Sequence, residues 1–557
     1  MDRAEQFERN LLVLYSKSPE LCGRLSNAET TQGHYDLLFS KNKLPVPAIK
    51  EPNIPARPLH SLMDPNKEAE RLVSTVHNTG YLVIFGLGGA YLVKAALERK
   101  DIQSIVIIDF NFDAMAELFS LMDFVPVFSD PRVTLIINPD RDYLFDFIIS
   151  TYKPALHGGI HVLPLRPRVD FEPALFADLY SLVKDSIDTV SEDYSVQAYF
   201  GKPWFANTIR NIFIAEKSLM TIAVPKHVSV TAAGPSLEIQ IPYLKQERDH
   251  TYILATDTSL PALLAHSIEP DAVISIDCQH ISYYHFLSGM PKHIPLFLDL
   301  SSPSVVALLT KNPCFFSGGH PLTRYISQYW RAFPFVDTSG GNVTYAAIAL
   351  ADQIGAETIN LYGADYSYPE GSTYARGTYI HALFNKGQDR LHPMESLFSA
   401  FLFRNDHLLK VIDEKLWRYE TKPLINYRKK LEILSGTLQT TLNVMAGNGA
   451  PIQVRAQNRM QFSNIRPVFA SGEAVQSGTA FLQYYSDRIQ GLPEFEGTLP
   501  QYLQQLNEND RDVFTTLLPL AAFIRQKNHG ISLRDLIQAV KIQAIDQITS
   551  LLSPTAR

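Results

Sequence analysis

The sequence predicts an α/β protein with two Rossmann-like parallel-sheet domains followed by a helical C-terminal domain. In two stretches, short apolar segments alternate with helical ones, which is typical of a parallel sheet covered by helices on both faces. From about residue 395 helical periodicity dominates instead. Because 557 residues exceed a single hydrophobic core, we expect domains at residues 1–200, 201–394 and 395–557.

The composition excludes several classes of protein. An apolar fraction of 46% rules out a mainly disordered chain, and a formal net charge of −7 offers no basic excess for nucleic-acid binding. Three scattered cysteines exclude a disulfide framework or a CxxC zinc site and fit a reducing compartment. The longest apolar run, at 81–93, is too short for a membrane span, and the N-terminus lacks an apolar signal region. We therefore expect a cytoplasmic protein with no membrane or nucleic-acid partner.

The first domain is expected to start with a helix and a proline-rich extended connector at residues 44–65. Strands follow at 82–85, 105–108 and 134–138. The turn Gly86–Gly89 after the first of them is similar to a dinucleotide- or S-adenosylmethionine-binding loop, with Asp109 placed to hold a ribose. Tyr91 stands where the GxGxxG pattern needs its third glycine, so the favoured interpretation is an ordinary strand–helix turn.

The second domain carries the candidate site. Apolar strands are predicted at 228–232, 252–256, 272–276, 295–298 and 359–362. Four of them deliver an acid at or just past the carboxyl end: Asp257, Asp277, Asp299 and Asp365. In open α/β sheets, ligands bind at this edge.

The first strand of this domain runs into Ala232–Glu238 (AAGPSLE). Small residues let the backbone approach a ligand, Pro235 restricts the turn and Ser236 is placed to cap the next helix. Free N–H groups at such a helix start favour a phosphate, whereas a well-capped helix is the alternative. We expect Gly234, Pro235, Ser236 and Asp257 to surround a nucleotide.

Two further segments could contribute to this site. In residues 338–356, Gly340 and Gly341 allow an unusual backbone path, and Asn342 is a good N-cap whose turn could hold a second phosphate or sugar. The segment 362–381 combines Asp365 with five tyrosines, Arg376 and His381. Tyrosine and arginine suit a leaving phosphate, and a histidine suits proton removal from an acceptor, a role for which His320 competes with His381.

Other catalytic motifs are missing from the sequence. It contains no HExxH, no GxxxxGK[ST] and no GxSxG. These absences count against a zinc protease, a P-loop NTPase and a common α/β-hydrolase.

At these residues the chain resembles the motility-associated factor (Maf) glycosyltransferases, which share a central domain with the MptE-like pterin pyrophosphokinases. The matching pieces are GPSL at 234–237, TDTSLPALLAHSIEPDAVISID at 256–277, SGGNV at 339–343 and GAD…ARGT at 363–378. Bacterial sialyltransferases bind CMP with a similar Gly-Asn-Gly-Pro-Ser-Leu turn, whose asparagine is alanine here. The resemblance implies a sialyltransferase-like central domain. Where family members often have a histidine, this chain has Tyr374.

The resemblance implies transfer of a nonulosonic acid, of the pseudaminic or legionaminic type, from its CMP-activated form to Ser/Thr hydroxyls of flagellin, for flagellar assembly and motility. No tightly bound cofactor and no metal ligand are expected, and Mg²⁺ is optional because phosphate is already a good leaving group. We expect Asp277, Asp365 and Arg376 near the sugar or phosphate, with His381 as the base.

Two alternatives stay open. The first is pyrophosphate transfer from ATP to a hydroxymethylpterin, with Mg²⁺ held by Asp257, Asp277 and Asp365. The second is a non-catalytic flagellin-binding protein whose helical C-terminal region docks amphipathic helices. The sequence predicts no oligomeric state.

Overall fold

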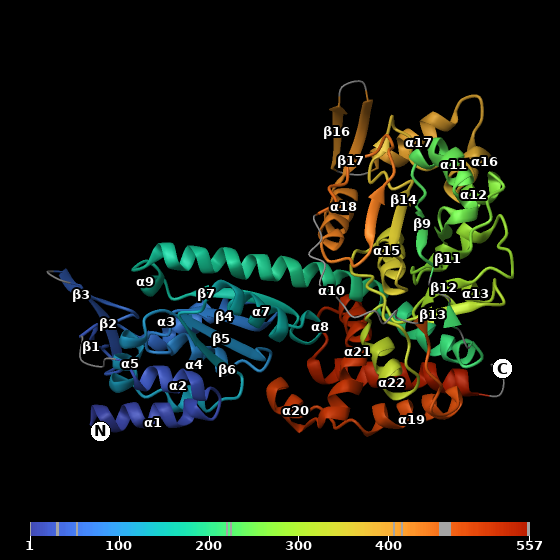
Figure 1. Ribbon diagram of the computed structural model, residues 1–557. Coiled ribbons are helices and arrows are strands. Elements are labelled where there is room, and N and C mark those ends of the chain that lie inside the picture. The colour runs from blue at the N-terminus through green and yellow to red at the C-terminus, as the bar shows by residue number, and fades with distance from the viewer. Residues whose placement is uncertain are drawn as a thin grey trace. The chain divides into compact units, whose positions relative to one another are not determined.

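The computed structural model describes residues 2–28, 33–51, 54–218, 221–222, 225–404, 407–413, 416–455 and 469–553. The chain forms two compact units (Figure 1). Unit 1 contains the residues up to Lys202 together with Arg488–Ile545, and unit 2 contains Pro203–Asp487 and the residues after Ile545. The chain first passes from unit 1 to unit 2 inside the long helix α10 (Pro173–Ala215), where Pro203 interrupts the helical hydrogen bonds.

Unit 1 contains a four-stranded parallel sheet with the order β6-β5-β4-β7. The central strand β4 (Thr79–Phe85) is buried along its whole length, which explains its unbroken apolar sequence. The predicted strands of this domain are confirmed as β4, β5 (Ser104–Asp109) and β6 (Val133–Ile137), and β7 (Gly159–Pro164) completes the sheet. The helices that accompany this sheet are α1 (Arg3–Tyr15), α2 (Pro19–Ser26), α3 (Pro65–Ser74), α4 (Tyr91–Leu97), α5 (Phe112–Leu121), α6 (Val125–Phe128), α7 (Arg141–Thr151), α8 (Pro154–His157) and α9 (Arg166–Val169).

The proline-rich segment 44–65 is not the extended connector that its composition predicts. It contains β2 (Pro45–Glu51) and β3 (Ile54–Pro58), which form an antiparallel sheet with β1 (Tyr35–Phe39). Val46 and Ala48 in β2 are completely buried. The burial of these side chains outweighs the hydrogen-bond donors that the prolines lack.

The predicted helical C-terminal region is confirmed for its last part. The helices are α19 (Gly478–Gly491), α20 (Leu499–Gln505), α21 (Glu508–Lys527) and α22 (Leu533–Leu552). Within unit 1, Arg525 of α21 donates hydrogen bonds to the carbonyls of Ala155 (2.7 Å) and Leu156 (3.2 Å) in α8. α20, α21 and most of α22 therefore belong to unit 1, whereas most of α19 belongs to unit 2.

Unit 2 is built on a seven-stranded parallel sheet with the order β13-β12-β11-β10-β9-β14-β18. The strands are β9 (His227–Thr231), β10 (Tyr252–Thr256), β11 (Ala272–Ser275), β12 (Leu296–Asp299), β13 (Pro313–Phe316), β14 (Thr358–Tyr362) and β18 (Thr441–Val444). The chain adds strands on one side of β9 up to β13 and then returns to place β14 on the other side. This reversal of strand order creates a topological switch point between β9 and β14, where open sheets bind ligands.

Helices and small sheets surround this sheet. The helices are α11 (Ser236–Gln246), α12 (Leu260–Ala265), α13 (Ser304–Ala307), α14 (Pro321–Tyr329), α15 (Val343–Gln353), α16 (Tyr379–Gly387), α17 (Met394–Phe403) and α18 (Lys422–Ser435). The remaining strands are β8 (Thr221–Ile222), β15 (Tyr368–Pro369), β16 (Leu408–Asp413), β17 (Leu416–Thr421) and β19 (Phe469–Ala470).

Residues 407–445 are mostly not helical, which corrects the sequence-based prediction. β16 and β17 form an antiparallel hairpin, α18 is the only helix of this stretch in the described residues, and β18 pairs with β14 in the main sheet. Pro423 in the first turn of α18 marks the change from strand to helix.

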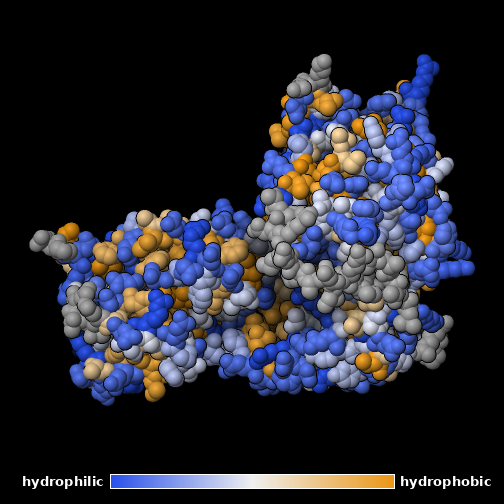
Figure 2. Space-filling model, in the orientation of Figure 1, coloured by the Kyte–Doolittle hydropathy of each residue, from blue (hydrophilic) through white to orange (hydrophobic). Residues whose placement is uncertain are grey.

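Polar residues predominate on the face of unit 2 that Figure 2 presents. No helix in the described part of the chain is long and apolar enough to cross a lipid bilayer.

Candidate functional site

Three loops meet at the switch point of unit 2. They follow β9 (232–236), β14 (363–365) and β18 (447–449). The Gly234 N–H donates to the Gly363 carbonyl at 2.8 Å, and the Asn448 N–H donates to the Ser236 hydroxyl at 2.8 Å. A Cβ on Gly234 would lie 2.4 Å from Oδ2 of Asp365, so the loops can approach this closely only because the residue is glycine.

Asp365 lies at the centre of these loops and is 3% exposed. Its Oδ2 accepts a hydrogen bond from the Ser236 N–H at 2.8 Å, and its carbonyl accepts one from Ala450 at 2.8 Å. Burial raises the pKa of the Asp365 carboxyl, while the hydrogen bonds from Ser236 lower it. The structure thus brings together three predicted site residues, Gly234, Ser236 and Asp365.

The N–H groups at the start of α11 are already used, which corrects the expectation that they are free for a phosphate. Ser236 donates to Asp365, Leu237 to the Gly234 carbonyl (3.0 Å) and Glu238 to the Pro235 carbonyl (3.1 Å). Pro235 has no N–H to offer. The carboxylate of Asp365 therefore takes the position that an external anion would occupy at this helix start.

A row of aspartates follows β10, β11 and β12, as predicted. Asp257 is 3% exposed and accepts hydrogen bonds from the Ser275 hydroxyl (2.6 Å) and the Thr258 N–H (2.7 Å). Asp277 is more accessible, and burial and the charge of Asp257 raise its pKa. Asp299 is buried, which raises its pKa, and it is held by the hydroxyl and N–H of Ser301.

Aromatic side chains and one arginine lie beside this row. Burial raises the pKa of Tyr379, and the negative charges of Asp257 and Asp277 raise it further, so these three groups lie within electrostatic range of one another. The Tyr379 ring lies 4.6 Å from that of His285, edge to face. The positive charge of Arg404 lowers the pKa of Tyr379, which places the guanidinium within electrostatic range of the same group.

Arg404 was not found by sequence reasoning. It also lowers the pKa of Tyr368 and opposes the burial that raises the pKa of Tyr374 to about 12. Arg404 directly follows α17, in a segment that the sequence assigns to a separate helical domain. Only the tertiary fold places this cation beside the tyrosines of the segment 362–381.

Arg376 and His381 lie around a different residue, Glu238 of α11. The Arg376 N–H donates to Glu238 at 2.9 Å, and the Arg376 side chain is 78% exposed. Burial lowers the pKa of His381, while the charge of Glu238 raises it.

His320, the competing candidate for the base, lies apart from the aspartate row and from Glu238. Burial lowers its pKa to about 3, and its ring contacts that of Trp204 at 4.6 Å.

The loop before α15 lies next to the tyrosines of the segment 362–381. Asn342 caps α15 as predicted, accepting a hydrogen bond from the Tyr345 N–H at 3.0 Å. Gly341 has a φ of +76°, and a Cβ there would lie 3.2 Å from the ring of Tyr427. Gly340 packs on the ring of Tyr345. The charge of ionised Tyr427 would in turn raise the pKa of Tyr374, so this loop adjoins the tyrosines.

A pocket of about 720 Å³ lies beside Asp365 on the β14–β18 side of the sheet. Its walls are the loop 445–452, Gln240 and the hairpin residues Asp413, Leu416 and Arg418. Sequence reasoning missed this loop. The available signal was Gly447-Asn448-Gly449 directly after the apolar segment of β18.

Asp257, Asp277 and Asp365 do not converge as a metal-binding set. Across the described residues, no three His, Cys, Asp or Glu side chains are grouped so that they could hold a metal ion. The Mg²⁺ arrangement that the pyrophosphokinase alternative predicts is therefore not preformed by these three carboxylates.

In unit 1, side chains of the protein itself fill the turn Gly86–Gly89. The Gly89 N–H donates to Nε2 of His60 at 2.9 Å, and a Cβ on Gly86 would lie 2.7 Å from the side chain of Arg168. Asp109 is fully buried and accepts from the Leu87 N–H and from Nε of Arg168, both at 2.9 Å. These contacts agree with the interpretation of an ordinary strand–helix turn.

Residues 206–371 match the protein-family model described as 6-hydroxymethylpterin diphosphokinase MptE-like. The chain contains an MptE-like domain. This domain includes the strands from β9 to β14 and all four aspartates described above, with Asp365 near its end. It stops before β18, so the loop 447–449 that packs on Asp365 lies outside it.

Several curated proteins of Treponema pallidum (strain Nichols), each called an uncharacterized protein, are similar to the chain. One is 34% identical over 139 residues, which cover 24% of this chain and 66% of that protein. A second is 35% identical over 124 residues, covering 22% and 44%, and a third is 26% identical over 244 residues, covering 44% and 53%. The chain thus spans less than two thirds of the length of each of these relatives.

One solved structure resembles the chain over both units, including the MptE-like domain of unit 2. It is the MAf glycosyltransferase from Magnetospirillum magneticum AMB-1, with a TM-score of 0.56 and 13% sequence identity. The likeness covers 99% of this chain and 96% of that chain. It confirms the predicted fold class of two parallel-sheet regions with a helical C-terminal region.

Proposed function

We propose that the chain is a glycosyltransferase that moves a nonulosonic acid of the pseudaminic or legionaminic type from its CMP-activated donor to Ser/Thr hydroxyls of flagellin. The observation that carries this proposal is the likeness to the MAf glycosyltransferase over nearly the whole of both chains. A stand-alone pterin enzyme would need only the MptE-like domain, whereas this chain keeps the surrounding elements as well.

The groups at the carboxyl edge of the sheet suit a CMP donor. In the proposed complex, Asp257 and Asp277 accept hydrogen bonds from the ribose hydroxyls. Arg404 and the hydroxyl of Tyr379 stabilise the phosphate as it leaves, because charge-assisted donors are the strongest partners of a phosphate oxygen. The sugar then extends across the switch point toward the pocket beside Asp365.

Asp365 is the proposed base. The acceptor oxygen forms a bond to the anomeric carbon of the sugar, and its proton passes to the carboxylate of Asp365. The bond between that carbon and the phosphate oxygen breaks, and its electron pair leaves with CMP. A pKa raised by burial suits this role, because a stronger base takes the hydroxyl proton more readily. His381, the base expected from the sequence, lies beside Glu238 instead.

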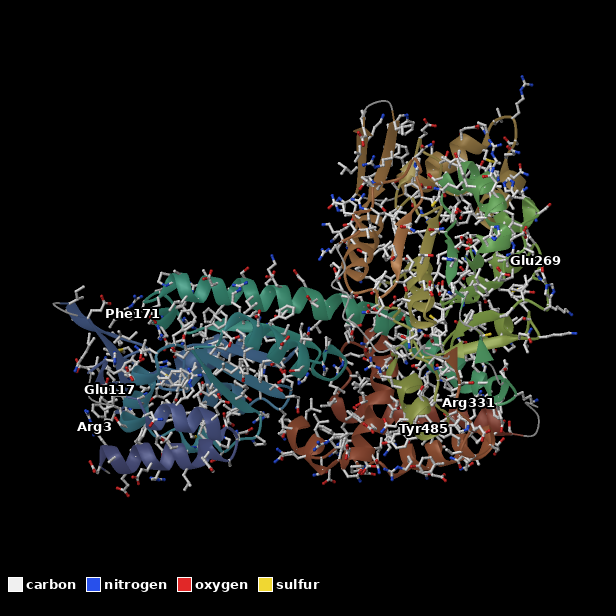
Figure 3. The ribbon with its side chains drawn as sticks, viewed as in Figure 1. Arg3, Glu117, Phe171, Glu269, Arg331 and Tyr485 are labelled. Carbon is white, nitrogen blue, oxygen red and sulfur yellow. The ribbon has the colours of Figure 1, made fainter. Side chains whose placement is uncertain are left out.

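The substitution Asp365→Asn tests this assignment. The asparagine oxygen can still accept the hydrogen bond from Ser236, so the loops keep their arrangement, but it cannot take a proton. We expect transfer from CMP-pseudaminic acid to flagellin to fall about 10²- to 10⁴-fold, while stabilisation of the protein by CMP is retained. Glu269→Gln is the control, because Glu269 lies at the periphery of the unit in an exposed pair with His293 (Figure 3). Full transfer by Asp365→Asn would contradict the assignment.

A second candidate is pyrophosphate transfer from ATP to a hydroxymethylpterin, which the description of the matching family model favours. Thermal unfolding with CMP and with ATP–Mg²⁺ separates the two. A ligand at 100 times its Kd should add about 2.7 kcal/mol to the free energy of unfolding. Stabilisation by CMP alone supports the glycosyltransferase, and stabilisation by ATP–Mg²⁺ alone supports the pyrophosphokinase.

A further inference from the structure

The hairpin β16–β17 presents an open strand edge in unit 2. β16 is the outer strand of the sheet β15-β17-β16 and pairs with β17 through six residue pairs. On its other side, no strand of the described chain pairs with it. Such an edge offers a row of unpaired N–H and C=O groups to another extended chain. Figure 1 shows the hairpin standing out from the rest of the unit.

The side chains of β16 protect this edge only in part. Proteins often shield open edges with prolines or charges, and β16 (LLKVID) has no proline and two charges, Lys410 and Asp413, of which Lys410 lies over the ring of Trp417 in β17. Leu409 is 56% exposed and Ile412 is 71% exposed. Hydrophobic residues are visible along the hairpin in Figure 2. An edge of this kind would promote aggregation unless a partner covers it.

One face of the hairpin borders the pocket beside Asp365. In the register of the hairpin, Asp413 is opposite Leu416 and Val411 is opposite Arg418. Asp413, Leu416 and Arg418 all line the pocket, so this face of the two strands looks into it. In a strand added next to β16, every second side chain would point to the same face of the sheet as Asp413 and the pocket.

The charges at the pocket wall are paired within the protein. Nε of Arg418 lies 2.8 Å from Glu420, and another of its nitrogens lies 3.9 Å from Asp413. Arg418 is the only cation among the described residues that line the pocket, so an acidic side chain would find no unpaired positive charge there. Small hydroxyl side chains, which both donate and accept hydrogen bonds, fit it better.

We propose that an extended segment of the acceptor protein adds to β16 as a further strand and presents a Ser or Thr side chain to the pocket beside Asp365. This inference rests on the proposed glycosyltransferase function and names how its protein substrate is recognised. Main-chain hydrogen bonds to β16 provide the affinity. Leu409 and Ile412 lie on opposite faces of β16, so side chains on one face of the added strand would pack beside Leu409 and those on the other face beside Ile412.

Fluorescence anisotropy with two labelled peptides tests the proposal on the full chain. Both peptides alternate valine and threonine between terminal lysines, and one is N-methylated at every second residue, which removes the donors along one edge. We expect methylation to weaken binding about tenfold or more, and Leu409→Asn and Ile412→Asn to weaken binding of the unmethylated peptide similarly. Ile433→Asn on α18 is the control, because Ile433 is 53% exposed but lies off the strand.

Two outcomes would overturn the inference. One is equal binding of both peptides. The other is a pair of results for Leu409→Asn or Ile412→Asn: peptide binding does not change, and light scattering shows that the variant is a monomer where the wild type is a dimer. That pair would assign the edge to a second copy of the chain. Stabilisation by CMP and hydrolysis of the CMP-sugar report on the donor site separately. Binding of the unmethylated peptide without either donor signal would support the strand addition and count against the proposed function.

Discussion

Two buried aspartates differ in the partners that hold their charge. Asp109 in unit 1 accepts from two backbone N–H groups and from Arg168, so its negative charge is paired with a buried positive one. Asp365 in unit 2 accepts from the N–H of Ser236, and burial raises its pKa. The first carboxylate therefore holds a turn together, and the second is suited to exchange a proton.

Removing Arg168 should strongly destabilise unit 1. Arg168→Ala leaves the fully buried Asp109 without its counter-ion, and we expect a loss of about 3–5 kcal/mol in the free energy of unfolding. Urea unfolding of the purified protein measures this loss. Arg166→Ala is the control, because Arg166 is exposed, and it should change stability by less than about 0.5 kcal/mol. Adding Asp109→Asn to Arg168→Ala should restore part of the lost stability. If the double variant is as unstable as Arg168→Ala alone, the ion-pair explanation is refuted.

The stability contributed by Asp277 should depend on pH. Its folded pKa is raised, so the unfolded chain releases the proton first and the wild type loses stability as pH rises through the raised pKa. Asp277→Asn keeps the acceptor for the Gln279 N–H and lacks this titration. We expect equal stability below about pH 3.9, the unfolded pKa, and a more stable variant at neutral pH. Thermal melts across this range check the sign, and a variant that is less stable at neutral pH would contradict it.

The two exposed arginines near the site should behave differently. Arg404 lowers the pKa of Tyr379, the tyrosine whose pKa Asp257 and Asp277 raise, whereas Arg376 is paired with Glu238. We expect Arg404→Ala to weaken stabilisation by CMP about tenfold or more in apparent affinity, and Arg376→Ala to have a smaller effect. Titration of the melting temperature with CMP measures both. The reverse order would favour the sequence-based choice of Arg376.

Part of the site could be predicted from residues alone. Gly234, Ser236 and Asp365 lie at the ends of neighbouring strands, so the strand pattern is enough to bring them together. Arg404 and the loop 447–449 could not be found in this way. Both come from elements after residue 394. A local sequence pattern does not show which distant segment packs against the edge of a sheet.

At the scale of elements, buried parallel strands were the most predictable feature. β4, β10 and β11 are nearly continuous apolar segments, since both of their faces are covered, and β9 and β14 keep an apolar residue at every second or third position. The hairpin β16–β17 was mistaken for a helix because it is only partly buried. Its apolar residues follow both a two-residue and a helix-like spacing, and only pairing across the turn decides between them.

The contact between the loops at the switch point should not tolerate a side chain at Gly234. A Cβ there would lie 2.4 Å from Oδ2 of Asp365, which the Ser236 N–H holds in place, and 2.5 Å from the backbone carbonyl of Gly363. We expect Gly234→Ala to cost about 1–3 kcal/mol and to lower transfer. The control is Gly23→Ala in α2, where nothing lies within 4 Å and the substitution should stabilise by about 0.5–1 kcal/mol. Chemical unfolding of both variants decides the comparison.

At the scale of the whole molecule, the MptE-like match is smaller than the unit that contains it. Leu431, Leu438 and Leu442 belong to the buried core of the main sheet but lie outside residues 206–371. We expect a fragment of residues 203–487 to unfold in one cooperative transition and to be stabilised by CMP. A fragment of residues 206–371 should show no cooperative transition, because β14 loses β18 and the core loses these leucines. Calorimetry on both fragments tests this, and cooperative unfolding of the shorter one would contradict it.

The hydrogen bond between Asp365 and the start of α11 has a consequence for competition between ligands. A tethered carboxylate is present at a very high local concentration, and it has already lost the translational freedom that a dissolved anion must still give up. Inorganic phosphate should therefore fail to displace it at neutral pH. Protonation removes the negative charge of Asp365, so occupancy of this helix start by a second anion becomes favourable only when the same residue has taken up a proton.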